Sequence, residues 1–151
     1  MTSARITQGG LSFARLHEES YLFVAATELL QTHPLRQPGD AAAHTLLELD
    51  PSLPLFRYFL DACPPEQTWA FAKTQFLGTI GPIRTRCLEG AGVAVLPAYY
   101  VKQDIKAKRL TPLLPKVKMG SDWFRLVWRQ GHPQTVAIQS LARELANLPL
   151  R

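Results

Sequence analysis

Residues 79–108 alternate between helix and strand patterns, and this alternation limits the possible folds more than any other feature of the sequence. Thr79 is a typical helix N-cap, and Pro82 is tolerated in a first helical turn because the N–H that it lacks has no partner there anyway. Apolar residues then recur at helical spacing on one face. We therefore predict a helix with a buried stripe made of Ile80, Ile83, Cys87 and Leu88.

A short strand and a second helix follow this first helix. Gly90 can adopt the left-handed conformation that ends many helices. Gly92–Pro97 is wholly apolar, which is typical of a strand covered on both faces of its sheet. Ala98–Lys108 has the pattern of the next helix. Strands that alternate with helices pair in parallel through right-handed crossovers, so the predicted fold class is α/β.

The segments before residue 79 add further strands and short helices. We place Thr27 as the N-cap of the first short helix, which ends before Pro34 because the residue preceding a proline avoids helical angles. The predicted strands are Leu16–Ala26, His44–Asp50 and Trp69–Phe76, and the predicted helices are Glu28–Thr32 and Leu53–Ala62.

The segments after residue 108 return to a strand and a closing helix. Trp123–Arg129 has strand composition, and Gln134–Asn147 carries an apolar helical stripe behind Pro133. At 151 residues the chain suits one domain, or two small lobes that share connections. With 46% apolar and 19% charged residues, it has the composition of a folded protein rather than a disordered one.

The net charge of +5 raises the question of nucleic-acid binding. The one dense basic cluster consists of Lys102, Lys106, Lys108 and Arg109, at the predicted end of a helix. Cations are favourable at a helix C-terminus because they interact with its dipole. DNA-binding faces instead concentrate such charge along one helix or groove. The charge pattern therefore favours a solvated helix end over direct binding of nucleic acid.

No membrane segment or secretion signal is predicted. The start of the chain, Met1–Arg5, has no apolar run behind it. The longest apolar stretches, Tyr21–Ala26 and Val93–Pro97, have the length of strands and are too short to cross a bilayer. The cysteines, Cys63 and Cys87, form no disulfide framework. We expect a cytoplasmic protein.

The ordered series of these segments resembles the effector domain of LysR-type transcription regulators. Residues 83–97 read IRTRCLEGAGVAVLP, which looks like the helix–GxGxxxLP–helix core of that family. The basic tail Lys106–Leu110 and the LP pair Leu114–Pro115 follow in the same order, and Thr32–Leu35 matches an xHPL turn earlier in the chain. The resemblance covers about 130 residues, so it is more specific than any single motif.

The resemblance implies a fold and a division into lobes. The fold is a type 2 periplasmic-binding-protein-like lobe, with a mixed, mainly parallel sheet flanked by helices, plus a remnant of the other lobe. Residues 1–20 would be a remnant of the first lobe, residues 21–118 the second lobe, and residues 119–151 the returning strand and C-terminal helix of the first lobe. The remnant would begin near Ala4–Ile6 or Phe13–Leu16.

The function implied by the resemblance is the sensing of a small-molecule effector, an anion or carboxylate, by a homodimeric bacterial transcription regulator. The family's winged helix-turn-helix and linker helix have no counterpart in this sequence. DNA would therefore be contacted only through segments that this chain lacks. The resemblance implies no cofactor and no enzymatic activity.

The candidate effector site lies at the ends of strands and helices. At Thr79 a hydroxyl and free backbone N–H groups would meet at a helix N-terminus, where the dipole favours anions. Gly78 would let a ligand approach the backbone closely. Thr27 and Pro97 end strands, and we place both at the carboxyl edge of the sheet, where open α/β folds bind ligands. Thr79, Thr27 and Pro97 also have a purely structural interpretation: the threonines can be helix caps, and Pro97 can be a turn residue.

Two other classes of protein stay open at this point. A two-lobe solute-binding protein would share the fold, although the missing signal peptide counts against it. A small cysteine-dependent enzyme would need Cys63 or Cys87 paired with a distant histidine, but Cys87 lies on an apolar stripe and Cys63 precedes a double proline. No metal site is predicted, because the histidines are not spaced as metal ligands usually are. They are His17, His33, His44 and His132.

Overall fold

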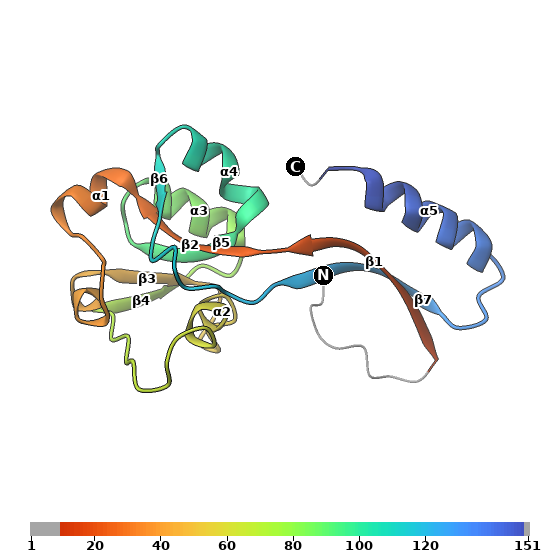
Figure 1. Cartoon of the computed structure of the whole chain (residues 1–151), viewed down its shortest axis with the longest axis horizontal. Coiled ribbons are helices and arrows are strands. Elements are labelled where there is room, and N and C mark those ends of the chain that lie inside the picture. The colour runs from red at the N-terminus through yellow and green to blue at the C-terminus, as the bar shows by residue number, and fades with distance from the viewer. Residues whose placement is uncertain (1–9, 150–151) are drawn as a thin grey trace. The chain divides into compact units, whose positions relative to one another are not determined.

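The computed structural model of the chain describes residues 10–149 and consists of two compact units (Figure 1). Unit 1 contains the described residues 10–19 and 121–149, and unit 2 contains residues 20–120. The piece near Ala4–Ile6, one of the two expected beginnings of the first lobe, lies outside the described residues. The other, Phe13–Leu16, lies within a strand of unit 1.

Unit 2 is built on a five-stranded sheet with the strand order β4-β3-β5-β2-β6. In chain order its strands are β2 (Tyr21–Ala26), β3 (Thr45–Glu48), β4 (Lys73–Phe76), β5 (Val93–Pro97) and β6 (Leu110–Pro112). β3 pairs in parallel with β4 and β5, whereas β2 runs antiparallel to β5 and β6. Four of the five strands therefore run in the same direction and β2 runs opposite to them, so the sheet is mixed and mainly parallel in strand direction, which confirms the predicted α/β class.

Helices cover both faces of this sheet. α3 (Ile80–Leu88) joins β4 to β5, α4 (Ala98–Lys106) joins β5 to β6, and α2 (Phe56–Leu60) lies between β3 and β4. Along the strand order, the connections from β4 to β5 and from β5 to β6 run one way, whereas the connection from β3 to β4 runs the other way. Because crossovers are right-handed, this reversal places α2 on the opposite face of the sheet from α3 and α4. Figure 1 shows α3 and α4 on one side of the sheet and α2 on the other. The remaining helices are α1 (Thr27–Thr32), after β2, and the 3-10 helix η1 (Pro38–Ala43), before β3.

Two glycines make the connection from α3 to β5 possible. Gly90 has φ +74°, and the N–H groups of Gly90 and of the next residue donate to the carbonyls of Cys87 and Arg86 at 3.0 Å each. These are the two hydrogen bonds of a Schellman motif, so the predicted C-terminal cap is confirmed. Gly92 lets β5 begin close against β3, because a Cβ built there would lie 2.3 Å from the carbonyl oxygen of Thr45.

Several predicted elements have different bounds in the structure. The predicted strand Leu16–Ala26 is divided at Ser20 into β1 (Leu11–Glu19) and β2. The predicted helix Leu53–Ala62 is shortened to α2, because its first residue has φ +52°, which an α-helix excludes. The predicted strand Trp69–Phe76 is confined to β4.

The core of unit 2 lies between the central strands and the helices on both faces. On the α2 side, Phe23 of β2 packs against Phe56 and Phe59, with ring centroids 5.7 Å and 4.8 Å apart. All three rings are buried. Aromatic pairs at such separations stabilise a fold beyond the burial of their area.

The predicted apolar stripe of α3 is only partly core. Ile83 and Cys87 are completely buried, whereas Ile80 and Leu88 are half-buried. The half-buried residues are the first and the last of this nine-residue helix, where the sheet beneath gives incomplete cover. The prediction that Leu88 is a full core residue is therefore wrong, and Ile83 has that role.

Unit 1 is a two-stranded antiparallel sheet with one helix. β1 pairs with β7 (Asp122–Arg129), and α5 (Thr135–Asn147) packs on β1. The His17 ring on β1 is hydrogen-bonded to the carbonyl oxygen of Leu145 at 2.9 Å. Among the described residues of this unit, only Ala142 is buried. The predicted strand and closing helix are confirmed, but together they enclose little core.

His44, directly before β3, is a buried histidine whose ring lies beside the backbone of His33 and Pro34 without a hydrogen bond of normal geometry to any of residues 10–149. Burial lowers the pKa of His44 below its ordinary value of 6.5. The folded chain therefore binds a proton at this ring less readily than the unfolded chain does. We expect the free energy of unfolding to fall as the pH decreases below 6.5, with a slope of at most about 1.4 kcal/mol per pH unit.

Urea unfolding at a series of pH values measures this slope. His44→Leu removes the ionisable ring and should flatten the profile below pH 6.5. His33→Gln should keep most of the slope, because it changes an exposed histidine whose ring centroid lies 6.4 Å from that of His44. An equally steep profile in His44→Leu would contradict the assignment.

Candidate functional site

Three parallel strands of unit 2 end at the same edge of the sheet, which we call the carboxyl edge. β3 ends there at Glu48, β4 is followed there by Gly78 and Thr79, and β5 ends there at Pro97. Open α/β folds bind ligands at this edge. The structure therefore brings Gly78, Thr79 and Pro97 together at one edge.

Gly78 and Thr79 form the turn between β4 and α3. Gly78 has φ +75°, a left-handed conformation that glycine adopts without strain, and its N–H donates to the carbonyl of Leu49 at 3.0 Å. Thr79 is the N-cap residue of α3, as predicted, but its exposed side chain makes no capping hydrogen bond. The hydroxyl is thus available to a ligand.

The first turn of α3 also keeps open backbone donors. The N–H groups at the start of an α-helix have no partner within the helix. Pro82 has no N–H, so Ile80 and Gly81 supply the open donors here. Together with the Thr79 hydroxyl, they form a small group of donors at the positive end of a helix dipole. This arrangement can bind an anion.

Pro97 has a structural role in addition to its place at this edge. It ends β5 opposite Tyr21 of β2, and it is the N-cap residue of α4. The N–H of Ala98 donates to the carbonyl of Ser20 at 2.8 Å, which fixes the start of α4. Pro97 is buried and has no N–H, so its ring shapes the edge without offering a donor.

Glu48 is a buried carboxyl group at the carboxyl edge and is not among the predicted site residues. Its carboxylate accepts N–H groups from Leu49 at 2.6 Å, Phe56 at 2.7 Å and Leu55 at 3.2 Å. The last two lie at the start of α2, so Glu48 caps that helix from the sheet. Burial raises the pKa of Glu48, and the backbone N–H groups oppose the shift. A glutamate within the apolar segment HTLLELD was the sequence signal for such a role.

Thr27 lies at the opposite edge of the sheet, the amino edge, so the prediction that it shares the carboxyl edge is wrong. β2 runs antiparallel to β5, and Ala25 pairs with Val93 at the start of β5. The next residue, Ala26, pairs with Leu110 at the start of β6. The prediction that Thr27 is a helix cap is also wrong, because Ala26 is the N-cap of α1 and Thr27 is its first helical residue.

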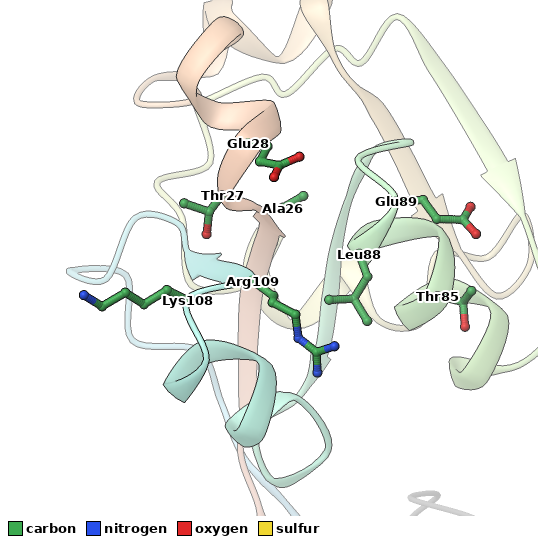
Figure 2. Close-up of a pocket in the computed structure, with 8 residues that line it drawn as sticks. All are labelled: Ala26, Thr27, Glu28, Thr85, Leu88, Glu89, Lys108 and Arg109. Atoms are coloured by element: carbon green, nitrogen blue, oxygen red, sulfur yellow. The ribbon is translucent and has the colours of Figure 1, made fainter.

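Thr27 instead lines a pocket at the amino edge (Figure 2). The pocket has a volume of about 410 Å³ and lies between the start of α1 and the C-terminal ends of α3 and α4. Ala26 and Leu88 form its apolar part. The polar and charged residues that line it are Thr27, Glu28, Thr85, Glu89, Lys108 and Arg109.

A buried carboxylate, Asp104, connects the helices beside this pocket. Asp104 of α4 is completely buried and accepts hydrogen bonds from Arg84 of α3 at 2.6 Å and 2.9 Å. Arg109 donates to the same carboxylate at 2.5 Å. Arg84 also lies over the ring of Tyr100, 5.3 Å from its centroid. One negative charge therefore holds two guanidinium groups and ties α3 to α4.

Neither cysteine has the environment of a nucleophile. Cys87 is completely buried, its thiol donates to the carbonyl of Val24 at 3.6 Å, and burial raises its pKa to about 12. Burial also raises the pKa of Cys63. Because the thiolate is the reactive form, these environments argue against a cysteine-dependent enzyme. Within residues 10–149, no three His, Cys, Asp or Glu side chains come together in a group that could hold a metal ion.

The sequence matches the family model of the LysR substrate binding domain over residues 2–148. The chain belongs to this family. The match extends far beyond the GxGxxxLP segment and includes residues of both units. No curated protein matches the sequence significantly.

Solved structures of LysR-type regulators share the fold of this LysR substrate-binding domain. The regulatory domain of CrgA from Neisseria meningitidis is 20% identical, with a TM-score of 0.74 over 95% of this chain and 71% of that one. LysG from Corynebacterium glutamicum, a full-length regulator with its effector arginine bound, is 17% identical, with a TM-score of 0.76 over 99% of this chain and 51% of that one. The effector domain of AmpR from Pseudomonas aeruginosa is 17% identical, with a TM-score of 0.71 over 93% of this chain and 66% of that one.

The chain spans about half the length of the full-length regulators CrgA and LysG. The structural matches establish the predicted fold, an α/β architecture of the periplasmic-binding-protein type. Because the substrate-binding domain accounts for residues 2–148, these 151 residues contain no winged helix-turn-helix. In the described part of the chain, every helix is too short or too polar to cross a membrane.

Proposed function

We propose that this LysR substrate-binding domain is the effector-sensing module of a bacterial transcription regulator, and that its effector, a small carboxylate or another anion, binds at Gly78 and Thr79. The observation that carries the proposal is the uncapped start of α3, where the Thr79 hydroxyl and the first backbone N–H groups follow a glycine turn. LysG with its bound arginine is a regulator of similar fold that binds a small molecule as effector.

A small anion suits the start of α3 for two physical reasons. The helix dipole favours a negative charge there by about 0.3–1 kcal/mol. Gly78 leaves room for the ligand, because a Cβ built on it would meet no atom within 4 Å. Pro97 shapes the same edge, whereas Thr27 lies at the amino edge and is not part of this site.

Replacing Thr79 by valine tests the site. We expect sulfate and acetate to bind the unaltered chain with millimolar dissociation constants, which correspond to a binding free energy of about 4 kcal/mol. The binding is weak because the edge is open to water, which weakens electrostatic contacts. In a titration followed by amide chemical shifts, the largest changes should occur in residues 77–80. Thr79→Val should weaken this binding by roughly tenfold, because it removes a hydrogen bond to a charged group.

Thr79→Ser is the matched control, since it keeps the hydroxyl and should bind sulfate as the unaltered chain does. Changes that gather at residues 106–109 and leave residues 77–80 unaffected would contradict the proposal. The anion would then be responding to the exposed basic residues at the end of α4.

The homodimer expected for such a regulator has a candidate surface at α2 and β4. β4 is an edge strand of the sheet, and Leu60 of α2 and Phe76 of β4 have 38% and 46% of their surface exposed. Proteins usually cover an edge strand that has apolar side chains beside it. Sedimentation of the chain should give a dimer mass, and Phe76→Lys should give a monomer. A monomeric unaltered chain at high micromolar concentration would contradict the assignment.

Unit 2 would correspond to the second lobe, residues 21–118, and unit 1 to the remnant of the first. The domain would act in the cytoplasm, where bacterial DNA lies, and DNA would be bound by other parts of the regulator. It would bind its effector without chemical conversion. A two-lobe solute-binding protein shares the fold, but the family match favours the regulator.

A further inference from the structure

We propose that the pocket at the amino edge is a second ligand site, specific for a small aliphatic amino acid. The pocket lies at the opposite end of the strands from Gly78 and Thr79, so it is distinct from the proposed effector site. Its volume of about 410 Å³ falls within the range of roughly 300–1,000 Å³ that is usual for small-molecule sites.

The charged residues of the pocket have opposite signs and come from different elements. Glu28 belongs to α1, whereas Lys108 and Arg109 follow α4 (Figure 2). In the described part of the chain, neither the Glu28 side chain nor the Lys108 side chain has a hydrogen-bond or ion-pair partner. Glu89, by contrast, is paired with Arg86 at 2.7 Å. An acid and a base that line one pocket without pairing suit a ligand that carries both an ammonium and a carboxylate group.

Arg109 adds positive charge for the carboxylate of such a ligand. Both oxygens of Asp104 are already bound by Arg84, so the single negative charge of Asp104 faces two guanidinium groups. The Arg109 side chain is 59% exposed. Arg109 can therefore attract a carboxylate, while Glu28 can bind an ammonium group. The exposed Lys108 side chain, which extends away from Leu88 in Figure 2, adds a second cation once it turns toward the ligand.

The apolar part of the pocket selects the side chain of the ligand. Ala26, at the end of β2, is buried, and Leu88, in the last turn of α3, is half-buried and lines the pocket. An aliphatic ligand that covers Leu88 removes apolar surface from water on both partners, which is favourable. A branched aliphatic amino acid such as leucine satisfies the charges and this surface together.

The backbone at Lys108 is left-handed, a conformation that glycine usually supplies at the end of a helix. Lys108 has φ +58° and follows the C-cap of α4, the same position that Gly90 occupies after α3. The N–H groups of Lys108 and Arg109 donate to the carbonyls of Ile105 and Asp104, as in a Schellman motif. Glycine adopts this conformation more easily than any other residue. Unfavourable backbone conformations of this kind cluster at ligand sites.

The probe is L-leucine, titrated into the full chain and followed by the amide chemical shifts of residues 26–28 and 108–109. 4-Methylpentanoate has the same branched chain but lacks the ammonium group, and 3-methylbutylamine lacks the carboxylate. We expect leucine to bind more tightly than either analogue by roughly tenfold, because each analogue leaves one charged wall of the pocket unpaired.

Lys108→Gly separates a binding role from a structural one. The variant should keep or raise the thermal midpoint of unfolding, because glycine relieves the left-handed backbone, and it should weaken leucine binding by roughly fivefold or more. Glu28→Gln should weaken leucine binding similarly and leave the binding of 4-methylpentanoate unchanged. Lys106→Gln is the matched control, an exposed lysine of α4 that does not line the pocket, and should bind leucine normally.

Several results would overturn the proposal. These are equal affinity for leucine and either analogue, shifts confined to residues 77–80, no shifts up to the solubility limit of leucine, and unchanged leucine affinity in both Lys108→Gly and Glu28→Gln.

Discussion

Replacing Ile83 by alanine should lower the free energy of unfolding by about 2–5 kcal/mol. Ile83 is completely buried between α3 and the sheet of unit 2, within the main hydrophobic core. Protein interiors are closely packed, so the lost methyl groups leave a cavity that the neighbours fill only in part. Urea unfolding followed by circular dichroism measures the change.

Leu88→Ala is the matched comparison on the same helix. Leu88 is half-buried and lines the pocket at the amino edge, so part of its surface already contacts water. Its loss should cost about 1 kcal/mol. Equal losses for the two variants would mean that α3 buries its apolar stripe evenly, as the helical periodicity alone suggests.

Replacing Asp104 by alanine should cost about 3 kcal/mol, the lower end of the range for removing one partner of a buried ion pair. Asp104 is completely buried, and its removal leaves Arg84 and Arg109 without their shared anion. The loss stays at the lower end because the side chains of Arg84 and Arg109 are 29% and 59% exposed and can be hydrated. Equilibrium unfolding in urea gives the value.

Two further variants show whether this effect depends on a buried charge. Asp104→Asn keeps the shape of the side chain and should lose most of the same stability. Arg86→Ala removes the exposed pair with Glu89, whose side chains are 46% and 53% exposed, and should change stability by no more than about 1 kcal/mol. A loss of stability in Arg86→Ala as large as that in Asp104→Ala would show that the burial of Asp104 does not increase the free energy that its ion pairs contribute.

The sequence by itself determined the elements whose cause is local. The periodicity of residues 79–108 was enough to predict a helix, a buried strand and a second helix, and all three are present. Thr79 and Gly90 could be placed at the ends of α3 because capping depends on the conformation of a few adjacent residues. The order of these segments was also sufficient to indicate the LysR family, which the match over residues 2–148 confirms.

The direction of β2 was decided only by the tertiary structure. An apolar strand has the same residue pattern whichever way it runs, because alternation and burial do not depend on direction. The antiparallel pairing of β2 with β5 moves Thr27 to the amino edge, away from Thr79 and into a pocket that the sequence did not predict. Strand direction also explains why the other three predicted site residues, Gly78, Thr79 and Pro97, share an edge. They lie at or just after the ends of β4 and β5, which run in the same direction.

The partners of Gly92, Glu48 and Asp104 also became visible only in three dimensions. Each depends on a partner distant in the sequence: the carbonyl of Thr45 for Gly92, the start of α2 for Glu48, and Arg84 for Asp104. In a linear pattern, a carboxylate on a helix or at a strand end reads as solvent-exposed, because exposure is its usual state. Burial of such a group becomes tolerable only when folding brings donors to it, and those donors come from contacts that no local pattern encodes.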